Sequence, residues 1–260
     1  MLAEAGKGVK PPTDPERRYL ACGRHAAAAF LRARPTAVHE LLVASEPGPE
    51  LARLAVAAGV AARPSSREEL DRLVGGVRHQ GVVAVGRPPR AASLEEILER
   101  RPPVVVVCDG ITDPRNVGAI FRSAEAAGAG ALALARDRAP RLSPALVRAA
   151  AGAVEWLPHL RVVNVARLLV RLRAEGFWVL GLDAGAERSI FEPSAFPGAP
   201  LALVVGSEGR GLRPLVSRSC DLKIAIPMAG RTASLNVSVA AAVALFEVRR
   251  RLRAGTGEAP

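Results

Sequence analysis

The stretch that decides the fold is Ile226-Pro-Met-Ala-Gly-Arg-Thr-Ala-Ser-Leu-Asn-Val-Ser238, because it joins two regular patterns. Residues 221–226 alternate apolar and polar side chains, which predicts a strand, and residues 237–252 repeat apolar side chains at helical spacing, which predicts an amphipathic helix. Ser234, Asn236 and Ser238 lie where the two meet. Each is a good helix N-cap, and together they also suit a ligand site beyond the carboxyl end of a strand, so both interpretations stand at this point.

Around this stretch, the second half of the chain alternates strand and helix patterns. Val104-Val-Val-Val107 is typical of a buried parallel strand. Further strands are predicted at 131–135, 177–182 and 201–205, and helices at 118–128, 144–150 and 165–174. The alternation predicts an α/β unit over residues 104–253, with a mostly parallel sheet and helices on both faces.

A smaller α/β unit is predicted over residues 19–87, with helices at 24–34, 51–58 and 67–74 and strands at 38–44, 60–62 and 79–85. Two Pro-Pro pairs, in Arg87-Pro-Pro-Arg90 and Arg101-Pro-Pro103, enclose a short helix that Ser93 and Glu96 would cap. They mark residues 88–103 as a linker. Residues 1–18 are predicted to form a disordered arm and residues 254–260 a C-terminal tail.

Composition narrows the classes of function. A formal net charge of +11 favours a polyanionic partner, nucleic acid first, although aromatic residues at 3% argue against a platform that stacks bases. The chain shows no apolar run long enough to span a membrane and no apolar core of a signal peptide, so a cytoplasmic location without membrane contact is expected. Its three cysteines and four histidines follow no metal-ligand spacing, so no metal site is expected.

Three loops follow three strong strands, at residues 109–118, 206–211 and 234–236. They contain no dinucleotide fingerprint, no P-loop, no Gly-x-Ser-x-Gly elbow, and no cysteine or histidine to act as nucleophile or base. What remains is glycine-bounded backbone, suited to close approach by a ligand. The polar candidates in and beside these loops are Asn116, Arg122, Glu208, Ser234 and Asn236.

Three motifs in these loops resemble those of the SpoU RNA 2′-O-methyltransferases, in family order. They are Asp113-Pro-Arg-Asn-Val-Gly-Ala-Ile-Phe-Arg-Ser123, Gly206-Ser-Glu-Gly-Arg-Gly-Leu212, and Ile226-Pro-Met followed by Ser234-Leu-Asn-Val-Ser238. The smaller unit, with Gly23-Arg-His25 and His79-Gln-Gly81, resembles the L30e-like substrate-binding domain of the branch that methylates guanosine in 23S rRNA. The resemblance covers residues 19–253.

The resemblance implies a homodimer of the SPOUT type, whose catalytic domain carries a trefoil knot and binds S-adenosylmethionine. Gly206, Ile226 and Leu235 would hold this cofactor largely through backbone groups, with Met228 and Gly211 nearby. Arg122 would lie at the reacting hydroxyl. Because a free arginine keeps its proton at neutral pH, we expect it to bind a target phosphate and stabilise a developing alkoxide; whether it also takes the proton is left open.

The other polar candidates have roles by the same resemblance. Asn116 would position Arg122 or the ribose, Glu208 would orient Arg122 or a loop amide, and Ser234 and Asn236 would line the same pocket. Each has a simpler alternative. Asn116, Ser234 and Asn236 could each serve only as a helix cap, and Glu208 could be a surface charge. Ser238 is interpreted as a helix-start residue only.

Phosphate contacts are expected from basic residues in or near the smaller unit, which position RNA without reading its sequence. They are Arg24, Arg32, Arg34, Arg87 and Arg90. Solvated surface arginines are the simpler alternative for each.

The function expected is therefore 2′-O-methylation of a guanosine in 23S rRNA. The alternatives are a tRNA guanosine-2′-O-methyltransferase, an rRNA adenosine 2′-O-methyltransferase that confers antibiotic resistance, and an RNA-binding or ribosome-assembly protein without catalysis.

Overall fold

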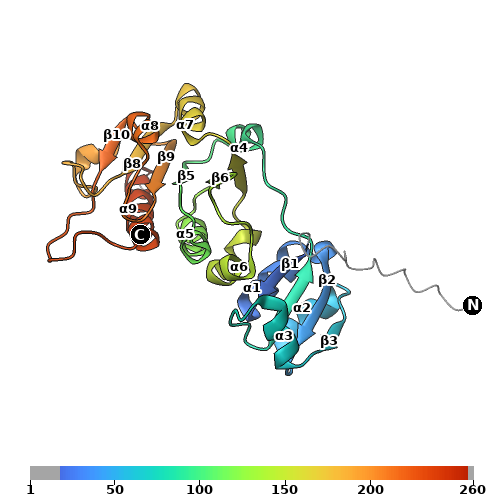
Figure 1. Ribbon diagram of the computed structural model, residues 1–260. Coiled ribbons are helices and arrows are strands. Elements are labelled where there is room, and N and C mark those ends of the chain that lie inside the picture. The colour runs from blue at the N-terminus through green and yellow to red at the C-terminus, as the bar shows by residue number, and fades with distance from the viewer. Residues whose placement is uncertain (1–17, 257–260) are drawn as a thin grey trace, which may run out of the picture.

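The computed structural model describes residues 18–256, which form two α/β parts, each built around its own sheet (Figure 1). The arm predicted at residues 1–18 lies outside the described residues except for its last residue. The C-terminal tail was predicted to start at residue 254, but α9 continues to Thr256, so only residues 257–260 of that tail lie outside the described residues. Within the described part, no helix is long and apolar enough to cross a membrane.

The larger part contains a six-stranded sheet in which every pairing is parallel, as the alternating pattern predicts. Its spatial order is β10-β8-β9-β5-β6-β7. The strands are β5 (Val104–Asp109), β6 (Ala131–Ala135), β7 (His159–Val162), β8 (Trp178–Leu182), β9 (Leu201–Gly206) and β10 (Leu222–Ile224). Because all six run the same way, the loops that follow them gather at one edge.

Helices cover both faces of this sheet. Val104 and Val106 of β5 pack on the side of α5 and α9, whereas Val105 and Val107 pack on the side of α4 and α7. This alternation is the two-residue period of a strand buried on both faces. The helices are α4 (Leu94–Arg100), α5 (Pro114–Ala126), α6 (Pro144–Ala150), α7 (Val165–Ala174), α8 (Pro214–Arg218) and α9 (Val237–Thr256).

The smaller part has a four-stranded sheet in the order β1-β4-β2-β3. Strand β4 is antiparallel to both β1 and β2, so β1 and β2 end at the edge where β4 begins. Helices α1 and α2 pack on one face and α3 on the other. The elements are β1 (Tyr19–Cys22), α1 (Arg24–Ala33), β2 (Val38–Val43), α2 (Pro49–Ala57), β3 (Ala62–Pro64), α3 (Arg67–Val74) and β4 (Val82–Gly86).

The two parts meet where α1 and β1 contact α6 and the 3-10 turn Ala153–Glu155 (Figure 1). A Cβ atom on Gly152 would lie 2.5 Å from the Cβ of Ala29 in α1, so the backbones approach closely there. The Glu155 side chain is 1% exposed; it accepts hydrogen bonds from Tyr19 Oη at 2.5 Å and from Arg34 Nε at 2.8 Å. Burial and the neighbouring carboxylate raise the pKa of Tyr19 well above its ordinary value, which keeps the phenol protonated as a donor.

The structure differs from several predicted boundaries. Helix α5 begins at Pro114, four residues before the predicted start, because Asp113 accepts a hydrogen bond from Arg115 N as the N-cap. Strands β1 and β7 and helix α8 were not predicted, since each is short and makes a weak periodic signal. Strand β3 lies at Ala62–Pro64, later than the predicted 60–62. Helix α4, inside the predicted linker, buries Ile97 against the large sheet.

Candidate active site

A cavity of about 580 Å³ opens at the carboxyl ends of β8 and β9 and beside the chain that follows β10. Its apolar walls include Leu182, Val205, Ile226 and Leu235, a composition suited to a small organic ligand. All five residues expected to contact a cofactor line this cavity: Gly206, Gly211, Ile226, Met228 and Leu235.

The loop after β9 turns back on itself beside the cavity. Ser207 N donates to Gly211 O at 3.1 Å, and Gly211 N donates to Ser207 O at 2.9 Å. A Cβ atom on Gly206 would lie 2.2 Å from the backbone carbon of Gly211, so any larger residue at 206 would force the loop open. The close return of the backbone explains why a glycine starts this loop.

The far end of the same loop is anchored by Asp109, a residue that sequence reasoning did not select. Its buried carboxylate, at the end of β5, accepts hydrogen bonds from Arg213 N at 2.9 Å and from Arg213 Nε at 2.6 Å. Two charge-assisted hydrogen bonds from one residue fix both its backbone and its side chain. Asp109 therefore ties the loop after β9 to the central strand.

The loop between β10 and α9 extends away from the sheet before it returns to start the helix (Figure 1). Asn236 Oδ1 accepts a hydrogen bond from Ser238 N at 2.9 Å, and Ala240 N donates to Asn236 O at 2.9 Å. Asn236 is thus the N-cap of α9. Ser238 lies in the first turn of that helix, in agreement with its interpretation as a helix-start residue.

Side chains from three loops meet in a cluster beside the cavity. Asn116 Nδ2 donates to Glu208 Oε1 at 2.8 Å, and Asn236 Nδ2 donates to the same oxygen at 2.7 Å. Asn236 Nδ2 also lies 3.1 Å from Asn116 Oδ1. Glu208 and Asn236 line the cavity as well, so this cluster, the Asn116–Glu208–Asn236 cluster, is part of the cavity rim. Asn116 is not the cap of α5, which is Asp113.

The other two polar candidates are placed differently. Ser234 is exposed and lines the cavity, without a hydrogen bond to any described residue. The Arg122 side chain is exposed on α5 and makes no hydrogen bond or ion pair within residues 18–256. It lies six residues after Asn116, and six steps of about 100° place it on another face of the helix. The described chain does not bring Arg122 to the cluster, and its role stays a prediction.

The cavity fits the cofactor that the motifs imply. The loop after β9 supplies backbone amides and carbonyls, and large apolar side chains remain partly open, with Met228 38% and Leu235 36% exposed. Asp183 and Glu208 bring two carboxylates to the lining, which suits a positively charged ligand, beside the single cation Arg210. Asp183 and its neighbours after β8 were missed because they carry no motif. They could have been found from the strand predicted at 177–182, because the carboxyl ends of parallel strands lie at the same edge of the sheet and the residues after this strand therefore face the site.

Nucleophilic chemistry by cysteine finds no support in the site. Burial raises the pKa of the Cys22 and Cys108 thiols to about 12 and that of Cys220 to about 11, so all three stay protonated at neutral pH. None of the described histidines lines the cavity. In the described range, no group of three or more His, Cys, Asp or Glu side chains is placed to hold a metal ion.

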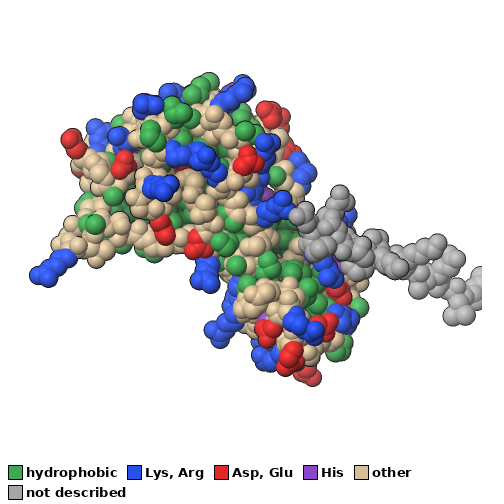
Figure 2. Space-filling view, in the orientation of Figure 1, with side chains coloured by type: hydrophobic (Ala, Val, Ile, Leu, Met, Phe, Trp, Pro, Cys, Tyr) green, Lys and Arg blue, Asp and Glu red, His purple; other side chains and the backbone are tan. Residues whose placement is uncertain are grey.

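Of the five arginines expected to contact RNA, four are engaged within the protein. Arg32 pairs with Glu50, Arg34 with Glu155, and Arg90 with Glu96, while Arg87 Nη2 donates to Thr36 O at 3.2 Å. Of the five, only the Arg24 side chain has no hydrogen bond or ion pair with the described residues. On the face that Figure 2 shows, basic and acidic side chains are interspersed over both parts, so the distribution of charge on that face does not locate a nucleic-acid surface.

Two family models match this chain. The model of the SpoU rRNA Methylase family matches residues 103–246, and the model of RNA 2'-O ribose methyltransferase substrate binding matches residues 20–92. The first therefore covers more than half of the chain, including all three loops of the site.

Curated relatives and solved structures extend over both parts. The 23S rRNA (guanosine-2'-O-)-methyltransferase RlmB of Pseudomonas putida is 42% identical over 88% of this chain and 95% of its own length. The protein of that name from a Burkholderia species is 43% identical over 91% and 98%. The crystal structure of the SpoU methyltransferase AviRb from Streptomyces viridochromogenes in complex with AdoMet has a TM-score of 0.72 and 28% identity, covering 91% of each chain.

Proposed function

The chain belongs to the SpoU rRNA methylase family, and from this premise we propose that it methylates the ribose 2′-hydroxyl of a guanosine in 23S rRNA, with S-adenosylmethionine as the methyl donor. Relatives named as 23S rRNA guanosine-2′-O-methyltransferases, 40% or more identical to this chain over most of its length, support the substrate. A related structure solved with AdoMet supports the donor.

One observation carries the proposal: the polar cluster and the cofactor cavity share residues. Glu208 and Asn236 contribute to the cavity wall and, in the same conformation, hold Asn116 of α5. A group transfer between two substrates needs both bound within a few ångströms and correctly oriented. A polar cluster on the rim of an apolar cavity meets that need.

When bound, S-adenosylmethionine supplies an electrophilic methyl group on a sulfonium centre. The loop around Gly206 and Gly211 would hold it through backbone groups, and Ile226, Met228 and Leu235 would enclose its apolar surface. The negative charge of Glu208 and Asp183 would favour the cationic sulfonium over the neutral product. Glu208 Oε1 already accepts from two amides, which leaves Oε2 to accept a hydrogen bond from the substrates.

The remaining polar residues would act on the RNA. Arg122, exposed and unpaired among the described residues, would bind the target phosphate and stabilise the alkoxide that develops as the hydroxyl loses its proton. Ser234, which also lines the cavity, would contact the ribose. Asn116, through its hydrogen bond to Glu208, would hold the start of α5 beside the cavity and so position the helix that carries Arg122.

A homodimer and a trefoil knot belong to the same proposal. Helix α9 exposes an apolar stripe in which Val239 is 48% and Phe246 53% exposed, with Val243 half-buried between them. Such a stripe on a helix that is otherwise packed is typical of an interface. A second copy of the chain is the partner proposed for it. A 23S rRNA substrate would place the protein in the cytoplasm.

The experiment that tests the function is a comparison of 2′-O-methylation in total RNA from cells with and without the gene. The proposal predicts that one guanosine of 23S rRNA loses its mark and regains it when the gene is restored. Loss of a tRNA mark instead would overturn the substrate. A protein that fails to bind S-adenosylmethionine in a calorimetric titration would revive the non-catalytic alternative.

A further inference from the structure

A basic surface lies at the junction of the two parts, and of its residues only Arg24 was expected from the sequence to contact RNA. Strands β1 and β2 end, and β4 begins, at the same edge of the small sheet, which brings the turns around Gly23, Ser45 and Gln80 together. Helix α6 of the larger part packs against this edge. The surface formed by Arg24, Arg78, Gln80 and Arg148 is called here the junction patch.

Side chains from both parts meet over Gly23. A Cβ atom on Gly23, whose φ is +90°, would lie 3.1 Å from Gln80 Oε1 and 3.4 Å from Arg148 Nε. Arg148, on α6, donates its Nε to the backbone oxygen of Arg78 at 2.9 Å. That bond uses the inner edge of the guanidinium and leaves the Nη donors for a ligand. The patch is therefore a single surface contributed by both sheets.

Gln80 is held in a conformation that glutamine rarely adopts, with φ at +56°. The turn is fixed from beneath by the buried His79, whose Nδ1 accepts from Gly81 N at 3.0 Å and whose Nε2 lies 3.0 Å from Asp71 Oδ1. The Gln80 side chain is exposed, and its amide makes no hydrogen bond with the described residues. A strained residue whose side chain gains nothing inside the protein suggests a function outside it.

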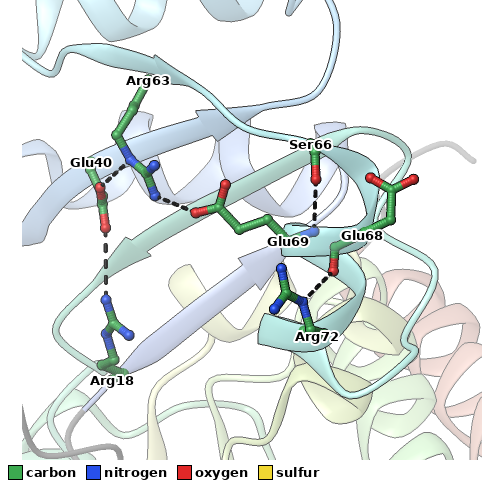
Figure 3. Close-up of polar contacts among 7 residues, drawn as sticks. All are labelled: Arg18, Glu40, Arg63, Ser66, Glu68, Glu69 and Arg72. Carbon is green, nitrogen blue, oxygen red and sulfur yellow. Dashed lines mark hydrogen bonds and ion pairs between the residues drawn. The ribbon is translucent and has the colours of Figure 1, made fainter.

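The guanidinium groups of the patch are not paired with carboxylates of the described residues, unlike that of Arg63 on the face over β3 and α3. The Asp71 carboxylate, which lines a hollow with Arg78 and Gln80, is instead paired with His79. Figure 3 shows the face over β3 and α3: Arg63 lies between Glu40 and Glu69, at 3.2 and 2.9 Å, and Arg18 also faces Glu40. By contrast, the Arg24 and Arg78 side chains are exposed and have no ion pair or hydrogen bond within residues 18–256. Unpaired guanidinium groups grouped on one surface are suited to phosphates.

We propose that the junction patch binds the substrate RNA beside the target nucleotide, with Arg24, Arg78 and Arg148 on phosphates and the Gln80 amide on the edge of an unpaired base. The proposal rests on the proposed function. An amide offers one acceptor and two donor hydrogens, which reads a base edge, and RNA is read in sequence mainly where its bases are unpaired.

The position of α6 supports this placement. A Cβ atom on Gly118 of α5 would lie 2.4 Å from Leu146 O of α6, so the two helices are in close contact. Arg122 lies one turn after Gly118 and hence on the same side of α5. A strand of RNA held at Arg148 would pass along α6 toward Arg122.

The test compares four variants of the full chain on transcribed 23S rRNA. Arg24→Ala and Arg78→Ala should each weaken binding severalfold and lower the slope of log Kd against log salt by roughly one. Arg63→Ala removes the same charge from a paired network and is the matched control, with less than about a twofold effect. Gln80→Gly should raise KM for the RNA by roughly tenfold, leave the affinity for S-adenosylmethionine unchanged, and preserve or raise the thermal midpoint because glycine tolerates this φ.

Two results would overturn the inference alone: Gln80→Gly with an unchanged KM, or Arg24→Ala and Arg78→Ala with no greater loss than Arg63→Ala, while the wild-type protein methylates the transcript. A wild-type protein that binds S-adenosylmethionine but methylates no 23S rRNA would overturn the proposed function and this inference with it.

Discussion

Asn116 donates a hydrogen bond to Glu208 at 2.8 Å although 92 positions separate the two residues in the chain. The contact joins the start of α5 to the loop after β9, and Asn236 closes it from the start of α9. It exists because β5 and β9 are adjacent parallel strands that end together, at the pair Asp109 and Gly206. The parallel sheet thus brings the three segments of the site together.

Replacing Asn116 by alanine should lower methyl transfer by roughly 10²-fold, because a small misplacement of reacting groups has that effect. Arg122→Ala should abolish transfer. Both variants should bind S-adenosylmethionine nearly as the wild type does, measured by calorimetry, since neither residue lines the cavity. Appreciable activity in Arg122→Ala would remove that residue from the chemistry.

Gly206→Ala should weaken cofactor binding, because the new methyl group would collide with the backbone of Gly211 and Leu212. The loop would open and its backbone groups would leave the cavity wall. Gly230→Ala is the matched control, since Gly230 lies in the loop before α9 with nothing within 4 Å of its Cβ position. Calorimetric titration should show at least a tenfold weaker affinity for the first variant only (about 1.4 kcal/mol); equal affinities would contradict the structure of the loop.

Glu155→Ala should destabilise the protein by about 3 kcal/mol, because it removes the partner of Arg34 and Tyr19 from a buried position. Urea unfolding measures this change. Glu175→Gln breaks an exposed pair with Arg171 one helical turn away and should change stability by about 0.5 kcal/mol or less. Similar small effects for both variants would show that Glu155 does not hold the junction.

Acid should destabilise the protein through His159. Burial, with Arg161 and Arg34 nearby, lowers the pKa of His159 to about 4, against about 6.5 in an unfolded chain. The unfolded state therefore binds more protons between these values, so stability is full above about pH 6.5 and falls as pH drops toward 4. The expected loss between about pH 7 and pH 5 is about 2 kcal/mol in urea unfolding.

His159→Phe keeps an aromatic ring beside Phe121 and removes the titrating group. The variant should lose that dependence across the same range. A variant with the same slope as the wild type would assign the acid sensitivity to other groups.

A charge in the apolar stripe of α9 should separate the proposed dimer. Phe246→Glu places a carboxylate where 53% of the phenylalanine is exposed, so the isolated chain would tolerate it while an apolar interface would not. Sedimentation should show a dimer for the wild type and a monomer for the variant. Glu175→Gln, at the C-cap of α7, is the control and should leave the assembly unchanged.

The sequence predicted the strands with continuous apolar runs. Val104–Asp109 and Leu201–Gly206 were found within one or two residues of their predicted ends, because strands buried on both faces carry a signal that needs no context. Short elements behaved differently. Strand β10 ends at Ile224 and β7 was not predicted at all, since hydrogen bonding to neighbouring strands defines them.

The sequence alone determined the fold class, an α/β sheet, and the residue types available at the site. Three loops after the strands carry glycines and small polar residues, and none of them contains a cysteine or histidine that could act as a nucleophile. Local patterns suffice for this, because they reflect periodicity and backbone freedom. Only the tertiary structure decided which groups act together. It brought Asn116, Glu208 and Asn236 into contact, left Arg122 apart, and paired Arg34 with Glu155 while leaving Arg78 open. Charge pairing and side-chain contact depend on distances between distant segments, and those distances exist only once parallel strands align their ends.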